Sequence, residues 1–265
     1  AAHGIKGMLE EEFYDMSKED PYELELLKTT PSSALGSVRY KLKNAEEDPT
    51  DYLRLLEVFK KYNIRYFFYN GGNDSMDTIK KLSDYAILRG HPTKFLGVPK
   101  TIDNDLALTD HTPGYGSAAK YIGTSVKEII QDSQALIYDK GLVTIVEIMG
   151  RNAGWLVGAA ALSKGEDCDG PDLIYVPELP FDIDNFLVRI KELLAEKTFV
   201  VVAVSEGIRL ADGRYVCELT DGVDFVDAFG HKQLTGTANY LARRLAQEIG
   251  CKTRTIELSS MQRAA

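Results

Sequence analysis

Strand-length apolar runs alternate with helix-length amphipathic segments along most of this chain. The apolar runs lie at residues 64–69, 94–98, 143–149, 173–176, 199–204 and 253–258. Helical spacing of apolar residues is found at 51–62, 75–88, 113–132, 153–162, 185–196 and 236–249. Parallel strands are joined by long crossovers, usually helices, and their sequences are apolar because both faces are buried. The alternation therefore predicts an α/β fold with mainly parallel sheets.

The alternating pattern is interrupted by a polar stretch near Asp139 and then begins again. At 265 residues the chain is long enough for one large domain or two modest ones. We therefore expect two domains, with a boundary between residues 138 and 139.

A glycine pair follows the first apolar run. Residues 69–75 read Tyr-Asn-Gly-Gly-Asn-Asp-Ser, so Gly71 and Gly72 lie between a predicted strand and a predicted helix. Backbone N–H groups at a helix start point outward, glycine lets a ligand approach closely, and the helix dipole favours negative charge. A glycine pair alone is more often an ordinary turn, but this position also suits an anion-binding site.

A second motif follows the next apolar run, where residues 98–105 read Val-Pro-Lys-Thr-Ile-Asp-Asn-Asp. It supplies a cation, Lys100, and two carboxylates, Asp103 and Asp105, whose i,i+2 spacing places them on one side if the segment is extended. Ligands of open α/β sheets bind at the carboxyl ends of strands, so the two motifs favour a common site. A phosphate cradle, a cation, oxygens that can hold a metal and a candidate base together indicate phosphoryl transfer.

The charge and composition of the chain narrow the classes of partner. The formal net charge is −9 and no block of like charge is present, which argues against general binding of nucleic acid or anionic membranes. No apolar run reaches the length of a membrane span, and no signal peptide is visible. Three scattered cysteines favour a reduced, cytoplasmic protein.

The second half of the chain also has charged residues at predicted strand ends. Arg151 follows the run 143–149 and Glu206 follows the run 199–204, while Arg254 and Arg263 lie around the last run. A single arginine is most often a solvated surface side chain. Arg151 and Glu206 are stronger candidates because both lie where a ligand site of this fold class is expected.

Taken together, the motifs resemble those of the phosphofructokinase family. Four elements occur in the family's order: Gly-Gly-Asn-Asp-Ser at 71–75, Pro-Lys-Thr-Ile-Asp-Asn-Asp at 99–105, Met-Gly-Arg at 149–151 and Gln-Arg at 262–263. The resemblance covers essentially the whole chain. It implies two similar three-layer α/β domains with mainly parallel sheets, facing each other across a cleft. It also implies a domain for pyrophosphate and Mg²⁺ at 1–138 and a fructose 6-phosphate domain at 139–265.

The resemblance implies roles for individual residues. Asp103 is similar to the base that takes the proton of the sugar 1-hydroxyl, and Arg151 and Thr101 are similar to groups that contact the phosphoryl group. The implied donor-binding residues are Arg39, Gly71, Gly72, Asn73, Asp74 and Lys100. The implied substrate-binding residues are Met149, Gly150, Arg151, Glu206, Arg254 and Arg263. Arg254 is contributed by a neighbouring subunit in the family, which implies a homodimer or homotetramer, and Asp74 and Asp105 are the implied metal ligands.

Two positions bear on the identity of the phosphoryl donor. Family members that use ATP typically have glycine where this chain has Asp74 and Lys100. A carboxylate and an ammonium here fill the space of the α-phosphate of ATP, as in the pyrophosphate-dependent branch that the chain resembles. The implied reaction is phosphoryl transfer from pyrophosphate to fructose 6-phosphate in glycolysis, and an ATP-dependent 6-phosphofructokinase is the alternative.

The chain departs from the family pattern in several places. Asn73 stands where the family usually has aspartate, and Ser260 stands where many bacterial members have a sugar-binding histidine. The family opens with a strand and a glycine loop before the first residue here, and it continues beyond Arg263. We therefore expect the chain to be a fragment that is inactive by itself.

Two other functions stay open from the sequence. Lipid and NAD kinases with a Gly-Gly-Asp-Gly-Thr loop share the glycine–aspartate element, but residues 100–105 and 149–151 count against them. A regulatory or truncated chain that binds a sugar phosphate without turnover is the non-enzymatic alternative. The presence of Asp103, Asp105 and Arg151 counts against this alternative.

Overall fold

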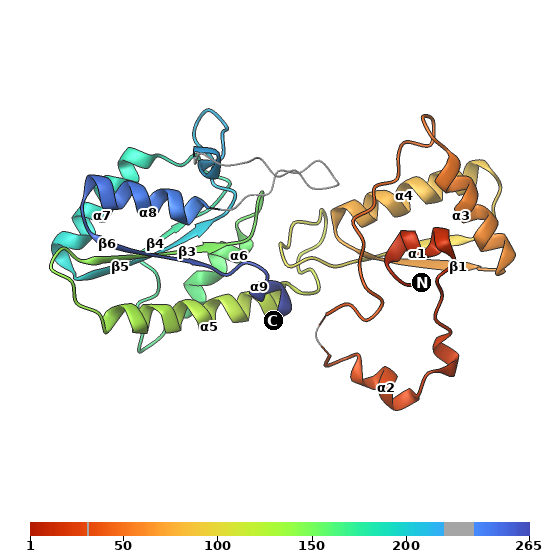
Figure 1. Ribbon diagram of the computed structural model, residues 1–265, viewed down its shortest axis with the longest axis horizontal. Helices are drawn as coiled ribbons and strands as arrows, with labels where there is room; N and C mark the ends of the chain where they lie inside the picture. Colours follow the sequence, from red (N-terminus) through yellow and green to blue (C-terminus); the bar gives the residue numbers. More distant parts are fainter. Residues whose placement is uncertain (31, 220–235) are drawn as a thin grey trace. The chain divides into compact units, whose positions relative to one another are not determined.

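The computed structural model describes residues 1–30, 32–219 and 236–265 (Figure 1). The chain divides into two compact units, one of residues 1–100 and one that contains the described residues from 101 to 263. Each unit combines helices with a parallel sheet, so the predicted α/β class is confirmed. The compact units divide between Lys100 and Thr101, and the functional boundary between residues 138 and 139 stays a prediction.

The first unit has a pair of parallel strands. Its elements are α1 (Gly4–Glu10), η1 (Met16–Lys18), α2 (Pro21–Leu26), α3 (Thr50–Lys61), β1 (Tyr66–Gly71), α4 (Asn73–Leu88) and β2 (Lys94–Pro99). Gly71 of β1 lies opposite Pro99 of β2 in the parallel register. Both strands therefore end at the same edge of the sheet.

The core of the first unit lies on one face of this sheet. Side chains of α1, α3 and α4 pack there with Phe67 of β1 and Phe95 of β2. Each large apolar side chain that is removed from water in this way contributes about 1.5–3 kcal/mol. On the other face, Phe68 and Leu96 are 62% and 39% exposed. β1 is thus half-buried, and the prediction of a strand buried on both faces is wrong for it, because the three helices cover the same face.

The second unit is built on a larger parallel sheet, which within the described residues has the strand order β4-β5-β3-β6. Its elements are α5 (Tyr115–Gln134), β3 (Leu142–Ile148), α6 (Trp155–Gly158), η2 (Ala159–Ser163), β4 (Leu173–Tyr175), α7 (Ile183–Glu196), β5 (Phe199–Ser205), η3 (Val216–Leu219), α8 (Thr237–Glu248), β6 (Lys252–Glu257) and α9 (Met261–Ala264). Among the helices that the structure describes, none combines the length and the apolar character that crossing a membrane requires.

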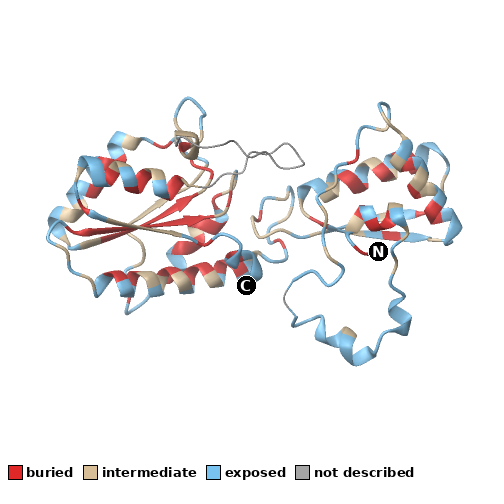
Figure 2. Ribbon diagram, viewed as in Figure 1, coloured by how far each residue is buried: buried red, intermediate tan, exposed pale blue. Residues whose placement is uncertain are grey.

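Helices cover both faces of this second sheet. Val143 and Ile145 of β3 belong to the apolar cluster that includes α7 and α8, whereas Val146 and Ile148 belong to the cluster that includes α5 and α6. Figure 2 shows the buried central strands between helices whose outer sides are exposed. The second unit therefore has the three layers that the sequence predicted.

The single helix predicted at residues 153–162 is split in two. α6 ends at Gly158, and the chain continues as the 3₁₀ helix η2. η2 packs closely on α5. A Cβ atom added to Gly123 of α5 would lie only 3.0 Å from the Cβ of Leu162 in η2. A glycine such as Gly158 loosens an α-helix at its own position, and the absence of a side chain at Gly123 allows the close approach of η2.

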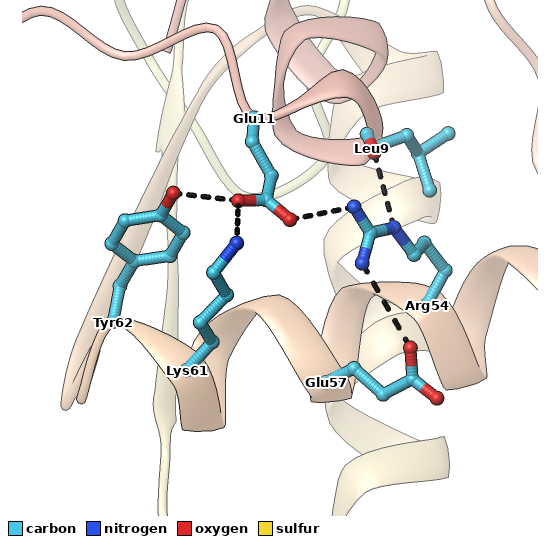
Figure 3. Close-up of polar contacts among 6 residues, drawn as sticks. All are labelled: Leu9, Glu11, Arg54, Glu57, Lys61 and Tyr62. Carbon is cyan, nitrogen blue, oxygen red and sulfur yellow. Dashed lines mark hydrogen bonds and ion pairs between the residues drawn. The ribbon is translucent and has the colours of Figure 1, made fainter.

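A carboxylate anchors the amino-terminal segment of the first unit to α3 (Figure 3). Glu11 follows α1, and its carboxylate accepts hydrogen bonds from Lys61 Nζ at 2.5 Å, Tyr62 OH at 2.6 Å and Arg54 Nη2 at 2.7 Å. Arg54 Nε also donates to the carbonyl of Leu9 at 3.2 Å. The hydrogen bond from Lys61, followed by those from Tyr62 and Arg54, lowers the pKa of Glu11 from 4.5 to about 2.

The lowered pKa of Glu11 predicts an acid-sensitive anchor. A depressed pKa stabilises the folded chain above pH 4.5, and this contribution is lost as the pH falls from 4.5 to about 2. Glu11→Gln should therefore speed hydrogen exchange of α1 amides near neutral pH, and the difference from wild type should disappear at the acid end of the window. Glu57→Gln is the matched control, because Glu57 is 73% exposed and lies 3.8 Å from the same Arg54. Equal exchange in both variants near neutral pH would contradict the anchor.

Candidate functional site

The first group of candidate residues lies at the shared end of β1 and β2. The backbone N–H of Lys100 donates to the carbonyl of Gly71 at 2.9 Å, which joins the segment after β2 to the end of β1. Gly72 is the N-cap of α4, and Asn73 and Asp74 form its first turn with exposed side chains. The structure thus brings five of the six predicted donor-binding residues to one edge of the sheet.

Glycine is required sterically at the turn between β1 and α4. A Cβ atom on Gly71 would lie 1.9 Å from the Oγ of Ser75. Gly72 has no side chain that could cap α4, so its own side chain does not compensate the positive end of the helix dipole. Arg39, the sixth predicted donor residue, is exposed in a segment without helix or strand.

The second group of candidates is built where β3 and β5 end side by side. Glu206 N–H donates to the carbonyl of Ile148 at 2.9 Å, and the hydroxyl of Ser205 donates to the carbonyl of Gly150 at 2.7 Å. The N–H of Gly150 in turn lies 3.4 Å from a carboxylate oxygen of Glu206. These bonds hold the Met-Gly-Arg segment against the Ser-Glu-Gly segment.

The close crossing of these two segments depends on Gly207. A Cβ atom at this position would lie 2.0 Å from the carbonyl oxygen of Arg151. The N–H of Gly207 also donates to Ser205 Oγ at 3.0 Å. Any side chain at position 207 would push away the backbone that carries Arg151.

The charges of several predicted residues act on the carboxylate of Glu206. Burial and, to a smaller extent, the negative charge of Asp103 raise the pKa of Glu206, which is about 7 once all its neighbours are included. The hydrogen bond from Gly150 and the positive charges of Arg151 and Arg263 act in the opposite direction. The charges of the predicted base and of two predicted arginines in the second unit thus act on one sugar-binding candidate.

The remaining predicted residues of the second unit have different surroundings. Thr101 Oγ1 accepts a hydrogen bond from the N–H of Asp103 at 3.2 Å, and Asp105 is exposed. Met149 N–H lies 3.3 Å from Gln262 Oε1. Arg254 pairs with Asp132 of α5 at 2.7 Å, and its proposed action in a neighbouring subunit stays a prediction.

The premise of an extended segment between Asp103 and Asp105 is wrong. Asn104 between them has a φ angle of 54°, in the left-handed region. Side chains alternate regularly only along extended backbone, so the i,i+2 spacing does not decide how the two carboxylates point.

From the sequence, Gln262 was named only as part of the Gln-Arg motif, and Arg209 was missed. Gln262 is 1% exposed and links Met149 to the segment that carries Arg263. Arg209 donates to the side chain of Asn152, next to Arg151, and to Tyr215 OH at 2.7 Å. The position of Arg209 three residues after Glu206 was the available signal.

A buried carboxylate on β3 was also missed. Glu147 is 5% exposed and accepts a hydrogen bond from the N–H of Ala238, in the first turn of α8, at 2.7 Å. Burial is the main cause that raises its pKa to about 7; the hydrogen bond from Ala238 opposes this shift, and the charges of Glu257 and Glu206 add to it. Glu147 lies inside the apolar run that forms β3, so the sequence pattern indicated a strand position and not a functional carboxylate.

The carboxylates present are compatible with Mg²⁺. This ion retains several waters and is usually held by one or two carboxylates together with substrate phosphates. Asp105 is an exposed carboxylate beside Asp103, and Asp74 is exposed at the start of α4. Within the described residues, no group of three or more His, Cys, Asp or Glu side chains is assembled for a metal. Each of these carboxylates is thus of the kind that could share an ion with substrate phosphates.

The raised pKa of Glu147 predicts a pH-dependent stability. The folded chain holds a proton on Glu147 that the unfolded chain releases between pH 4.5 and about 7, so the free energy of unfolding should fall as the pH rises through this window. Glu147→Gln keeps an oxygen acceptor for Ala238 and should reduce this fall. Denaturant unfolding at about pH 5 and about pH 7.5 measures the change, with Glu196→Gln on the exposed end of α7 as control. A Glu147→Gln variant with the pH dependence of wild type would refute the raised pKa.

Comparison with known proteins agrees with the fold and with the family that the motifs resemble. The family described as Phosphofructokinase matches residues 1–265. A Xanthomonas campestris protein named pyrophosphate--fructose 6-phosphate 1-phosphotransferase is 46% identical over 100% of this chain, and a Halomonas elongata protein of the same name is 43% identical over 99%. The chain spans 63% and 62% of the length of these two relatives.

Solved structures give the same result. The pyrophosphate-dependent phosphofructokinase of Marinobacter aquaeolei matches 99% of this chain with a TM-score of 0.82 at 38% identity, and the chain covers 59% of that structure. The enzyme of the same name from Nitrosospira multiformis matches 100% of the chain with a TM-score of 0.84 at 36% identity, and the chain covers 61% of it. The family named from the motifs is thereby confirmed, and the chain belongs to the phosphofructokinase family.

Proposed function

We propose that the full-length protein transfers a phosphoryl group from pyrophosphate to the 1-hydroxyl of fructose 6-phosphate, giving fructose 1,6-bisphosphate in glycolysis. The observation that carries the proposal is the edge of the first sheet, where Asp74 and Lys100 flank the glycine turn of Gly71 and Gly72. The names of the relatives from Xanthomonas campestris and Halomonas elongata support the same donor and acceptor.

In this reaction the sugar hydroxyl is the nucleophile. Asp103 takes its proton while the hydroxyl oxygen forms a bond to the terminal phosphorus of pyrophosphate. The bond from that phosphorus to the bridging oxygen breaks, and inorganic phosphate leaves with the bond electrons. Thr101 and Arg151 contact the transferred group, where fixed hydrogen-bond donors and positive charge stabilise the developing charge.

The fructose 6-phosphate site belongs to the second unit in this proposal. Met149, Gly150 and Arg151 contact the sugar or the transferred phosphoryl group. Glu206 accepts hydrogen bonds from the sugar hydroxyls, and its neighbourhood with Arg151 and Arg263 supports this assignment. Arg263 binds the 6-phosphate, because guanidinium groups match phosphate oxygens in geometry and charge. Arg254 does so from a neighbouring subunit of a homodimer or homotetramer.

Pyrophosphate and Mg²⁺ complete the proposal. Gly71, Gly72, Asn73 and Lys100 bind the donor with backbone N–H groups and positive charge, and Arg39 contributes a further guanidinium. Asp74 and Asp105 would hold Mg²⁺, which when bound neutralises negative charge on the phosphates.

The compartment proposed is the cytoplasm. Cys168, Cys217 and Cys251, all within the described residues, are free thiols. Free thiols persist in reducing compartments, where disulfides are rare.

Use of ATP is the second candidate. A Streptomyces coelicolor protein named ATP-dependent 6-phosphofructokinase 3 is 32% identical to 73% of this chain. Asp74 and Lys100 are the residues that favour pyrophosphate over ATP, so these two positions decide between the candidates.

The proposed base gives the first test. Asp103→Ser in the full-length protein should lower kcat by about 10²–10⁴, the usual share of acid–base catalysis, with little change in KM for fructose 6-phosphate. Steady-state kinetics measures both constants. Asp110→Ser removes an exposed carboxylate of the same loop and serves as control. A loss confined to KM would make Asp103 a binding residue instead.

The donor site gives the second test. ATP would bring its α-phosphate against Asp74, and like charges in a partly dry site repel each other. Asp74→Gly should therefore raise kcat/KM for ATP relative to that for pyrophosphate by about tenfold or more, which corresponds to ~1.4 kcal/mol; this ratio cancels the loss of a proposed Mg²⁺ ligand, which affects both donors. Lys100→Gly should mainly lower kcat/KM for pyrophosphate, because it removes a point charge suited to a small anion.

The control for the donor test is Asp77→Gly, which also places a glycine in α4 but one turn away from its start. It should leave the ratio of the two donors unchanged. A wild type that prefers ATP, or an Asp74→Gly variant without any gain in ATP use relative to pyrophosphate use, would overturn the pyrophosphate assignment.

A further inference from the structure

The loop before α5 carries Asp103 and Asp105 but has little regular structure of its own. Its two limbs meet at a bridge between Thr101 and Gly114, where Thr101 N–H donates to the carbonyl of Pro113 at 3.2 Å. Between these ends, backbone hydrogen bonds alone do not explain how the two carboxylates are held. The side chains inside the loop supply the missing bonds.

Asn104 lies between the two carboxylates and is 6% exposed. Its Oδ1 accepts from the N–H of Thr112 at 2.8 Å and lies 3.1 Å from the Thr112 hydroxyl. Its Nδ2 donates to the carbonyl of Asp110 at 3.2 Å. One buried amide therefore fastens the carboxylate-bearing limb of the loop to the returning limb.

Thr112 completes this connection from the other limb. It is fully buried, and its hydroxyl donates to the carbonyl of Thr101 at 2.7 Å. The hydroxyl has one proton, so this shorter bond is its main one, and Asn104 Oδ1 is the secondary acceptor. Thr101 Oγ1 accepts in turn from Asp103 N–H at 3.2 Å. The bonds form a closed ring through Thr101, Asp103, Asn104 and Thr112.

The backbone conformation adds a second constraint. Asn104 has a φ angle of 54°, a left-handed conformation that asparagine tolerates better than most residues other than glycine. Glycine could adopt this backbone but could not make the three side-chain contacts. Aspartate could accept from Thr112 but could not donate to the carbonyl of Asp110.

We propose that Asn104 and Thr112 act as positioning residues, which together hold the carboxylates of Asp103 and Asp105 in their reactive directions. This role rests on the proposed function, in which Asp103 is the base and Asp105 a metal ligand. Neither Asn104 nor Thr112 touches substrate in this proposal. Their effect on the reaction passes through the loop backbone on either side of Asn104.

The test compares hydroxyl removal at two buried threonines in the full-length protein. Thr112→Val should lower kcat by about tenfold to hundredfold with KM for fructose 6-phosphate within about threefold of wild type, because misplacement of a reacting group acts on the chemical step. Thr112→Ser keeps the hydroxyl and should restore kcat to within about threefold. Thr144→Val is the matched control, since Thr144 is 1% exposed and its hydroxyl lies 3.0 Å from that of Ser133.

Asn104→Gly provides the second variant, because it permits the left-handed backbone and removes the amide. It should show the same loss of kcat as Thr112→Val. Hydrogen exchange gives a readout besides activity: the Thr112 N–H, which is bonded to Asn104 Oδ1, should exchange faster in Asn104→Gly than in wild type.

The outcomes separate the positioning role from the proposed function. A Thr112→Val variant that loses no more kcat than Thr144→Val, while wild type turns over, would overturn the positioning role alone. Unchanged exchange of Thr112 N–H in Asn104→Gly would also overturn it. Absence of wild-type turnover with pyrophosphate and with ATP would overturn the proposed function and with it the catalytic purpose of the ring, even if exchange became faster.

Discussion

Parallel strands that end in register are the constraint on which both groups of candidate residues depend. In the second unit Ile148 lies opposite Ser205, so the chain leaves β3 and β5 at the same level. Residues that are 55 positions apart in sequence, Gly150 and Ser205, are then joined by one hydrogen bond. Because the two exits are this close, position 207 can only be glycine next to the Arg151 carbonyl. The apolar packing of the strands thus decides where the polar residues meet.

The same packing imposes a cost on the carboxylates near the strand ends. Charged groups are unfavourable in a poorly hydrated interior unless they are paired or neutralised. Glu147 responds with a pKa raised to about 7 and with a hydrogen bond from Ala238 at the start of α8. Residues that lower stability, such as buried carboxylates, are expected at functional sites, where the rest of the fold compensates for the loss. The sheet clusters on both faces of β3 provide that compensation here.

Periodicity was a sufficient guide to most of the fold, because burial of apolar side chains decides where β3, β5 and α7 form. Charged residues directly after strands, such as Arg151 and Glu206, could also be located from the sequence. Glu147 could not, since it sits inside an apolar run and its partner Ala238 is 91 positions away. The direction of Asp105 could not be predicted either, because it depends on the left-handed backbone of Asn104. Contacts between distant segments and rare backbone angles do not change the spacing of apolar residues, so they cannot be predicted from periodicity.

The chain is acidic, yet its proposed substrate is an anionic phosphate ester, and the buried carboxylates at the proposed sugar site reduce this conflict. The formal net charge of −9 counts every carboxylate as ionised. Burial raises the pKa of Glu206 and of Glu147 to about 7, so both carboxyl groups ionise less readily than exposed ones. The negative charge around Arg151 and Arg263 is therefore smaller than the residue count suggests, while each guanidinium stays fully charged. Burial of the carboxylates thus makes the local potential more positive at the position where the phosphate group of the sugar is proposed to bind.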